Sequence, residues 1–337
     1  MFTTIVIASI VLMALSSVVF LLARYLPIIA NLIMNVTIRR VAGEHVPLAG
    51  ETVTFETADG VRLVGTLTAP VSGRPDAPIV VFCHEYTSDR HSATKYGWFL
   101  QEDGFRVFAF DFRGHGDSDC PANYIPRQWV TEHEICDVRS ALRFLQGRSD
   151  CVGTGASVAL FGVSRGAVAA LIAAADEPTV SAVVSDSAFC FAKTLHGYMR
   201  RWAPIFVDPR MLVLSAPDRI FSVFRWLATR LAEHRVGVRF LPLVPTLRRL
   251  DRPVFFLHGE DDHYIEHSQA QMLQRCVVTA EPCWIVPQAD HNRAVDVAPM
   301  AYRRRVVQFL RTSLGVTETV APSGTSRPVG TRGTTGV

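Results

Sequence analysis

A serine stands between two glycines in the pentapeptide GVSRG, residues 162–166, where a strand pattern meets a helix pattern. Residues 157–163 are apolar, as in a buried strand, and residues 167–175 are rich in alanine, which favours a helix. A chain that turns from strand to helix within one or two residues strains the residue at the apex, and flanking glycines leave room for that turn. The pentapeptide also occurs by chance, but this placement favours Ser164 as a nucleophile with its hydroxyl exposed beside the first amides of the helix.

A serine hydroxyl is a poor nucleophile near neutral pH, so it needs a general base and a carboxylate that orients the base. Two later strand patterns end in polar loops that carry such groups. Residues 253–257 lead into the loop HGEDD at 258–262, and residues 283–286 lead into a loop that contains His291. The serine therefore precedes the acid and the base, unlike in chymotrypsin or subtilisin. This pattern predicts acyl transfer with His291 as the base.

Four motifs together give the chain a resemblance to the α/β-hydrolase superfamily over about residues 50–315. They are the serine pentapeptide, His84-Glu85-Tyr86 after a strand pattern at 78–83, DFRGHGDS at 111–118 after a strand pattern at 105–110, and HGEDD. The resemblance makes Asp262 the acid and, by position, makes the backbone amides of Tyr86 and Arg165 the donors of an oxyanion hole. Within the superfamily, the chain is similar to membrane-tethered serine hydrolases of the Bem46 and ABHD13-like kind.

The alternation of strand and helix patterns predicts an α/β fold, with a mostly parallel central sheet and helices on both faces. A β-hairpin is expected at residues 51–68. Helices are expected at residues 93–102, 128–146 and 300–313.

Two acidic residues leave alternatives open near the predicted site. Asp186 follows the strand pattern at 182–185 and could replace Asp262 as the acid, but the match to the HGEDD loop favours Asp262. Glu85 stands where the superfamily usually has glycine, and it could be catalytic or structural. The structural role is favoured, because the acyl-transfer roles are already filled and a nearby carboxylate would oppose a developing oxyanion. Asp111 and Arg113 are likewise expected to be structural.

The N-terminal residues 2–23 carry no charge, and as a helix they would span roughly 33 Å, enough to cross a bilayer. A secretory signal is the alternative, but no basic segment precedes the apolar run. The next apolar segment is expected to be broken by Pro27 and to lie at the membrane interface. Since Arg24, Arg39 and Arg40 all follow the span, the catalytic domain is predicted to be cytoplasmic. Seven cysteines without regular spacing agree with a reducing compartment.

The 337 residues divide into six expected parts. They are a transmembrane anchor at 1–24, a juxtamembrane segment at 25–48, hydrolase core at 49–190, a helical lid insert at 191–252, further core at 253–314 and a disordered tail at 315–337. Between residues 199 and 252, 11 arginines face 4 acidic residues, a local net charge of +7 against +3 for the whole chain. This charge indicates either a solvated basic face or a lid that rests on an anionic membrane.

The predicted function is a membrane-anchored serine hydrolase that cleaves carboxylic esters or thioesters with an acyl chain. This chemistry needs no cofactor and no metal. A peptidase of the prolyl-oligopeptidase type is one alternative, although such enzymes usually carry a propeller for which this chain has no residues. A non-catalytic membrane scaffold is the other. The expected partners are a small-molecule or lipid ester and a membrane; nucleic acid is not expected, because no binding motif for it is present, and the oligomeric state is left open.

Overall fold

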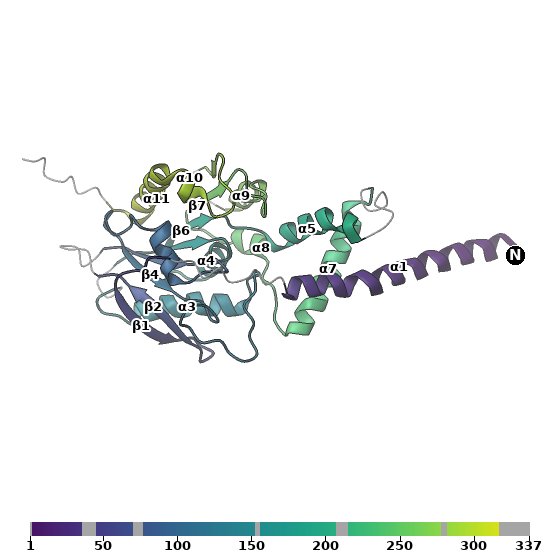
Figure 1. Cartoon of the computed structure of the whole chain (residues 1–337), viewed down its shortest axis with the longest axis horizontal. Helices are drawn as coiled ribbons and strands as arrows, with labels where there is room; N and C mark the ends of the chain where they lie inside the picture. The colour runs from purple at the N-terminus through teal and green to yellow at the C-terminus, as the bar shows by residue number, and fades with distance from the viewer. Residues whose placement is uncertain are drawn as a thin grey trace, which may run out of the picture.

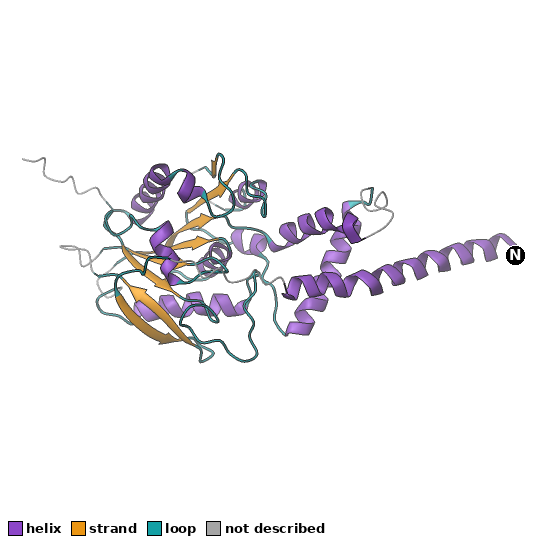
Figure 2. Cartoon of the chain, viewed as in Figure 1, coloured by secondary structure: helices purple, strands orange, loops and turns teal. Residues whose placement is uncertain are grey.

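The computed structural model describes residues 2–35, 45–69, 77–151, 156–206, 215–277 and 282–316. An 8-stranded sheet in the order β1-β2-β4-β3-β5-β6-β7-β8 forms its centre (Figure 1 and Figure 2). The strands are β1 (Glu51–Glu56), β2 (Arg62–Leu67), β3 (Ile79–Cys83), β4 (Arg106–Phe110), β5 (Val158–Val163), β6 (Val180–Asp186), β7 (Val254–Gly259) and β8 (Trp284–Val286). β2 pairs antiparallel with β1 and β4, and all other pairs are parallel. The prediction of a mostly parallel sheet is confirmed.

Helices cover both faces of the sheet, as expected. One face packs against α2 (Ala93–Tyr96), α10 (Ala294–Val297) and α11 (Pro299–Leu314). The other packs against α3 (Glu132–Gln146), α4 (Arg165–Ala174), α8 (Leu243–Leu247) and α9 (Ser268–Gln274). Because β3, β4, β5 and β7 are buried throughout, their sequences are apolar runs rather than alternating ones, apart from Arg106 in β4 and His258 in β7.

The start of α3 is fixed by its own first residues. The Thr131 hydroxyl accepts a hydrogen bond from the His133 amide at 3.2 Å, and the Glu134 carboxylate accepts one from the Thr131 amide at 2.7 Å. This capping box satisfies backbone donors that have no partner inside the helix. The helix therefore begins at Glu132 rather than at residue 128.

The N-terminal helix α1 (Phe2–Asn35) projects away from the sheet domain (Figure 1). It is the one helix of the described residues that is long and apolar enough to cross a membrane, with a mean hydropathy of 2.9 over its most apolar window. A signal sequence meets the same criterion. The helix continues through Pro27, so the expected break at this residue is wrong. Arg39 and Arg40 lie outside the described residues, as does the tail from residue 317 onward.

The inner end of α1 is part of the hydrophobic core. Ala30 and Ile33 are buried, and the Trp129 indole donates a hydrogen bond to the Ile33 carbonyl at 3.0 Å. The Arg127 guanidinium also donates one to the Met34 carbonyl at 3.2 Å. The loop before α3 therefore fixes α1 to the sheet domain.

The insert between β6 and β7 contains α5 (Phe191–Phe206), α7 (Asp218–Val236) and α8. α7 packs along α1 and against α5. We call α1, α5 and α7 together the helical arm, which extends from one side of the sheet domain (Figure 1). Residues 207–214 of the insert lie outside the described residues.

Candidate active site

Ser164 occupies the turn between β5 and α4. Its backbone has φ +51° and ψ −115°, a strained conformation for a residue with a Cβ atom. A hydrogen bond of 2.8 Å from the Ser164 amide to the carbonyl of Asp186, at the end of β6, holds this conformation. The strand-to-helix turn expected from the sequence is therefore present.

The two flanking glycines are needed because backbone approaches closely on both sides. A Cβ atom at residue 162 would lie 2.4 Å from the Cα of Ala167, and one at residue 166 would lie 2.1 Å from the carbonyl oxygen of Cys83. Real Cβ contacts are never this short. Gly166 therefore lets the serine turn lie against the end of β3, which leads to Glu85 and Tyr86.

We expect Gly166→Ala to lower the free energy of unfolding by about 3 kcal/mol, because backbone atoms at the end of β3 would have to move. Gly197→Ala in α5 is the matched control. A Cβ atom there meets nothing within 4 Å, so alanine should stabilise the helix by about 0.5–1 kcal/mol. Thermal unfolding of both variants in detergent measures the difference, and equal melting temperatures would contradict this account of the turn.

Ser164, His291 and Asp262 form a continuous hydrogen-bonded chain. The Ser164 Oγ lies 3.0 Å from Nε2 of His291, and Nδ1 of the same ring lies 2.6 Å from Oδ2 of Asp262. His291 follows β8 and Asp262 follows β7, so the parallel sheet brings both loops to the end of β5. The arrangement can deprotonate a serine hydroxyl and stabilise the imidazolium that results.

Asp262 is buried and held as a carboxylate. Its Oδ1 accepts hydrogen bonds from the amides of Tyr264 at 2.9 Å and Ile265 at 2.7 Å. Nε2 of His258 lies 2.9 Å from Oδ2. Burial alone would raise the pKa of Asp262, but the hydrogen bonds from His258 and His291 outweigh it and hold the pKa well below the usual range. The carboxylate is therefore charged at all pH values near neutrality.

Asp186, the rival acid, and Asp290, which directly precedes His291, make other contacts. Asp186 accepts hydrogen bonds from the hydroxyls of Ser187 and Tyr302, each at 2.8 Å, and burial raises its pKa. Asp290 accepts one from the backbone amide of His291 at 2.7 Å. Of the three carboxylates, Asp262 is the one within hydrogen-bond distance of the imidazole ring.

Comparison with known proteins agrees with this arrangement. Residues 80–309 match the family model described as "Alpha/beta hydrolase family", which is more than half of the 337-residue chain. The chain belongs to the alpha/beta hydrolase family.

Relatives and solved structures extend this finding. The chain is 25% identical over 274 residues to the uncharacterized protein YfhR of Escherichia coli K12, with 80% of this chain and 83% of YfhR covered. It is 26% identical over 244 residues to the uncharacterized protein Rv2307c of Mycobacterium tuberculosis, with 72% and 73% covered. An esterase of Pyrococcus furiosus shares the fold with a TM-score of 0.61 at 21% identity, covering 82% of this chain and 97% of the esterase. An esterase domain from Rhodothermus marinus does so with a TM-score of 0.52 at 24% identity, covering 79% and 99%.

The two candidate oxyanion donors of this hydrolase lie on neighbouring segments. Arg165 is the first residue of α4, where helix amides lack intrahelical acceptors. Tyr86 follows β3, and its loop is tied down by its hydroxyl, which donates to the Pro126 carbonyl at 2.9 Å. The ring of His84 fixes the same loop, since it accepts a hydrogen bond from the Phe112 amide at 3.1 Å.

Glu85 points into a small polar cluster. Its carboxyl group accepts hydrogen bonds from the Ser92 hydroxyl at 3.0 Å and the Tyr96 hydroxyl at 3.4 Å. Burial raises its pKa. These contacts give Glu85 partners away from the Ser164 hydroxyl, which agrees with the structural alternative.

The turn after β4 is also held by buried ion pairs. The Arg90 amide donates to Asp111 at 2.7 Å and the Arg90 guanidinium pairs with the same carboxylate. Arg113 donates to Asp137 through Nε at 2.8 Å and Nη2 at 2.7 Å. Asp111 and Arg113 thus have the structural contacts expected of them.

His258 is the site residue that the sequence reasoning missed. The signal was present, because His258 opens the same HGEDD loop that supplies Asp262. Its Nε2 faces two acceptors, Asp262 and the Ile265 carbonyl, so it carries the proton. Among the described residues, no group of three or more His, Cys, Asp or Glu side chains could hold a metal ion.

Proposed function

We propose that this protein is a membrane-anchored serine hydrolase that cleaves carboxylic esters or thioesters through an acyl-enzyme on Ser164. The observation that carries the proposal is the hydrogen-bonded chain from the Ser164 hydroxyl through His291 to the ionised Asp262. It supplies a nucleophile, a base and an orienting carboxylate in the order that acyl transfer requires.

In the proposed reaction, Ser164 Oγ attacks the carbonyl carbon while its proton passes to Nε2 of His291. The amides of Tyr86 and Arg165 donate hydrogen bonds to the oxyanion, and Asp262 stabilises the imidazolium. The bond to the leaving alcohol or thiol then breaks, and the leaving group takes the proton from His291. Water attacks the acyl-enzyme and gives a proton to His291, which returns it to Ser164 as the carboxylic acid departs.

The two alternatives to this proposal are a peptidase of the prolyl-oligopeptidase type and a non-catalytic membrane scaffold. The names of the esterases that share the fold support ester substrates over peptides. A scaffold has no use for a strained serine held within hydrogen-bond distance of a histidine and a carboxylate, so this geometry favours an enzyme.

The membrane anchor is part of the proposal. Its support is the exposed apolar surface of α1 up to Leu21 and the absence of a charged residue between Phe2 and Ala23. Because Arg24, Arg39 and Arg40 follow this span, we place the hydrolase domain on the cytoplasmic side. The tether agrees with a place among the Bem46 and ABHD13-like hydrolases. The insert, with its excess of arginine, is proposed to act as a lid near anionic lipid.

A substrate panel on the detergent-solubilised full chain tests the function. We expect hydrolysis of nitrophenyl acetate, octanoate and dodecanoate and of a dodecanoyl thioester, with kcat/KM about tenfold or more above that for a peptide nitroanilide. A preference for the peptide would favour the peptidase. Turnover no faster than that of the Ser164→Ala variant on every substrate would favour the scaffold.

A further inference from the structure

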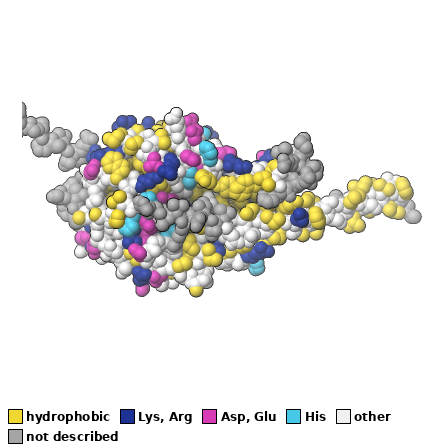
Figure 3. Space-filling model, viewed as in Figure 1, with side chains coloured by type: hydrophobic (Ala, Val, Ile, Leu, Met, Phe, Trp, Pro, Cys, Tyr) yellow, Lys and Arg dark blue, Asp and Glu magenta, His cyan; other side chains and the backbone are white. Residues whose placement is uncertain are grey.

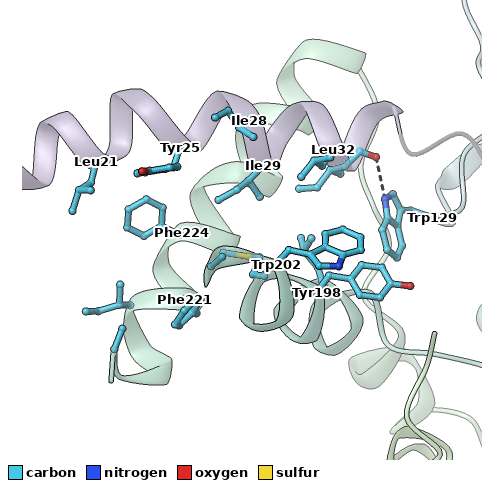
Figure 4. Close-up of a pocket in the computed structure, with 16 residues that line it drawn as sticks. Leu21, Tyr25, Ile28, Ile29, Leu32, Trp129, Tyr198, Trp202, Phe221 and Phe224 are labelled. Carbon is cyan, nitrogen blue, oxygen red and sulfur yellow. Dashed lines mark hydrogen bonds between the residues drawn. The ribbon is translucent and has the colours of Figure 1, made fainter. Parts of the chain in front are cut away.

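An apolar cavity lies inside the helical arm. It has a volume of about 390 Å³, within the range of roughly 300–1,000 Å³ typical of small-molecule sites. α1 forms one wall and α5 and α7 form the other (Figure 4). None of the described residues that line it is charged. Such a lining recognises an apolar ligand.

The cavity is elongated along α1. Its lining on this helix runs from Leu21 to Ile33, which at 1.5 Å per residue is about 18 Å. Figure 4 shows Leu21 and Phe224 at one end and Trp129 and Tyr198 at the other. This shape suits a chain of methylene groups better than a compact ring system.

At one end of the cavity, α5 contacts the loop that carries Asp262. Tyr198, which lines this end of the cavity, belongs to α5. On the same helix, Arg201 donates a hydrogen bond to the carbonyl of His263 at 3.0 Å, in the loop that carries Asp262. The ring of Tyr264, in that loop, lies 5.9 Å from the ring of His291. This end of the cavity is therefore joined through α5 to the loop that carries Asp262, beside the ring of His291.

The other end lies where α1 leaves the protein. Residues 2–21 of α1 would span about 30 Å, which equals the hydrocarbon thickness of a bilayer. Leu21 would then stand at the membrane surface, and Arg24, the first charged residue, just beyond it. Beside this end, α5 and α7 expose Ile205, Val223 and Trp226, each more than half accessible. Figure 3 shows hydrophobic side chains gathered on part of the arm.

We propose that the arm cavity binds the acyl chain of a lipid ester, which enters from the bilayer along α1 and places its ester group at Ser164. The inference rests on the proposed function and names its substrate class, a long-chain ester resident in the membrane that holds α1. The anchor helix is then one wall of the acyl site, so anchoring and substrate selection use the same element.

Replacing either of two alanines by phenylalanine distinguishes binding in this cavity from binding to any apolar surface of the arm. Ala203 lines the cavity on α5, whereas Ala23 is exposed on α1 outside the lining. Ala203→Phe fills part of the cavity, and Ala23→Phe adds the same ring elsewhere on the arm. Neither residue belongs to the proposed catalytic machinery.

The kinetic test compares nitrophenyl acetate with nitrophenyl dodecanoate, using the full chain in phosphatidylcholine vesicles. Each methylene buried contributes about fourfold to binding, so displacing two or more by Ala203→Phe should lower kcat/KM for dodecanoate about tenfold or more. The acetate value should stay within about twofold. Ala23→Phe should change neither. Equal losses on both esters, or no loss on dodecanoate, would overturn the acyl site.

A second test measures binding of an apolar chain without relying on catalysis. The full chain in the same vesicles is photolysed with a dodecyl diazirine, and labelled peptides are mapped by mass spectrometry. We expect label on α5 between Leu195 and Ala203, lost in Ala203→Phe and kept in Ala23→Phe. Label on α5 without ester turnover would refute the proposed hydrolase function and keep the apolar-chain site. Turnover without this label would refute the site and keep the function.

Discussion

Ser164→Ala should lower kcat for ester hydrolysis by about 10⁴-fold or more, because the variant has no nucleophile and keeps only oxyanion stabilisation and binding. Steady-state kinetics on nitrophenyl octanoate measure the loss. The strained backbone at residue 164 tolerates alanine no worse than serine, so the melting temperature should change little. A variant that stays folded and retains more than about a tenth of the activity would contradict the assignment of Ser164.

Asp262→Asn should lower kcat by about 10⁴-fold, because an amide neither holds His291 in the required tautomer nor stabilises its charged form. Asp186→Asn is the matched control. Burial raises the pKa of Asp186, so a neutral amide replaces a group that is already closer to neutral. We expect the control to retain activity within about tenfold. A large loss in Asp186→Asn with little loss in Asp262→Asn would assign the acid to β6.

Asp262 also makes a pH-dependent contribution to stability. Its pKa in the folded protein is below the unfolded value, so its contribution is full above about pH 4, the unfolded pKa, and is lost as the pH falls further toward the folded pKa. The difference in melting temperature between wild type and Asp262→Asn should therefore shrink as the pH falls below about 4. A difference that does not shrink below about pH 4 would contradict the ionised state of Asp262.

Much of the sheet domain was predictable because its local signals agree with one another. β3, β4, β5 and β7 are buried on both faces, so each reads as an apolar run. Their parallel order brings the loops after β5, β7 and β8 to one edge, which is why separate motifs on the chain meet in the structure. Gly166 was predictable from the turn, but its contact with the Cys83 carbonyl was not.

Other features depend on tertiary contacts that leave no local pattern. Pro27 removes one backbone donor, yet α1 continues because its inner half packs on α7 and the sheet domain. The partners of Glu85 are side chains from η1 (Arg90–Ser92) and α2, whose sequence does not mark them as such. The arm cavity arises where the N-terminal helix meets an insert far along the chain. Sequence spacing alone cannot show such a meeting.

The most direct test of the central claim is the mass of the protein after reaction with a fluorophosphonate. We expect one phosphonyl group per chain, located by peptide mapping on Ser164, and no adduct in Ser164→Ala. The labelling should proceed at neutral pH, because Asp262 is charged there. An adduct on another residue, or equal labelling of Ser164→Ala, would contradict the claim that Ser164 is the nucleophile.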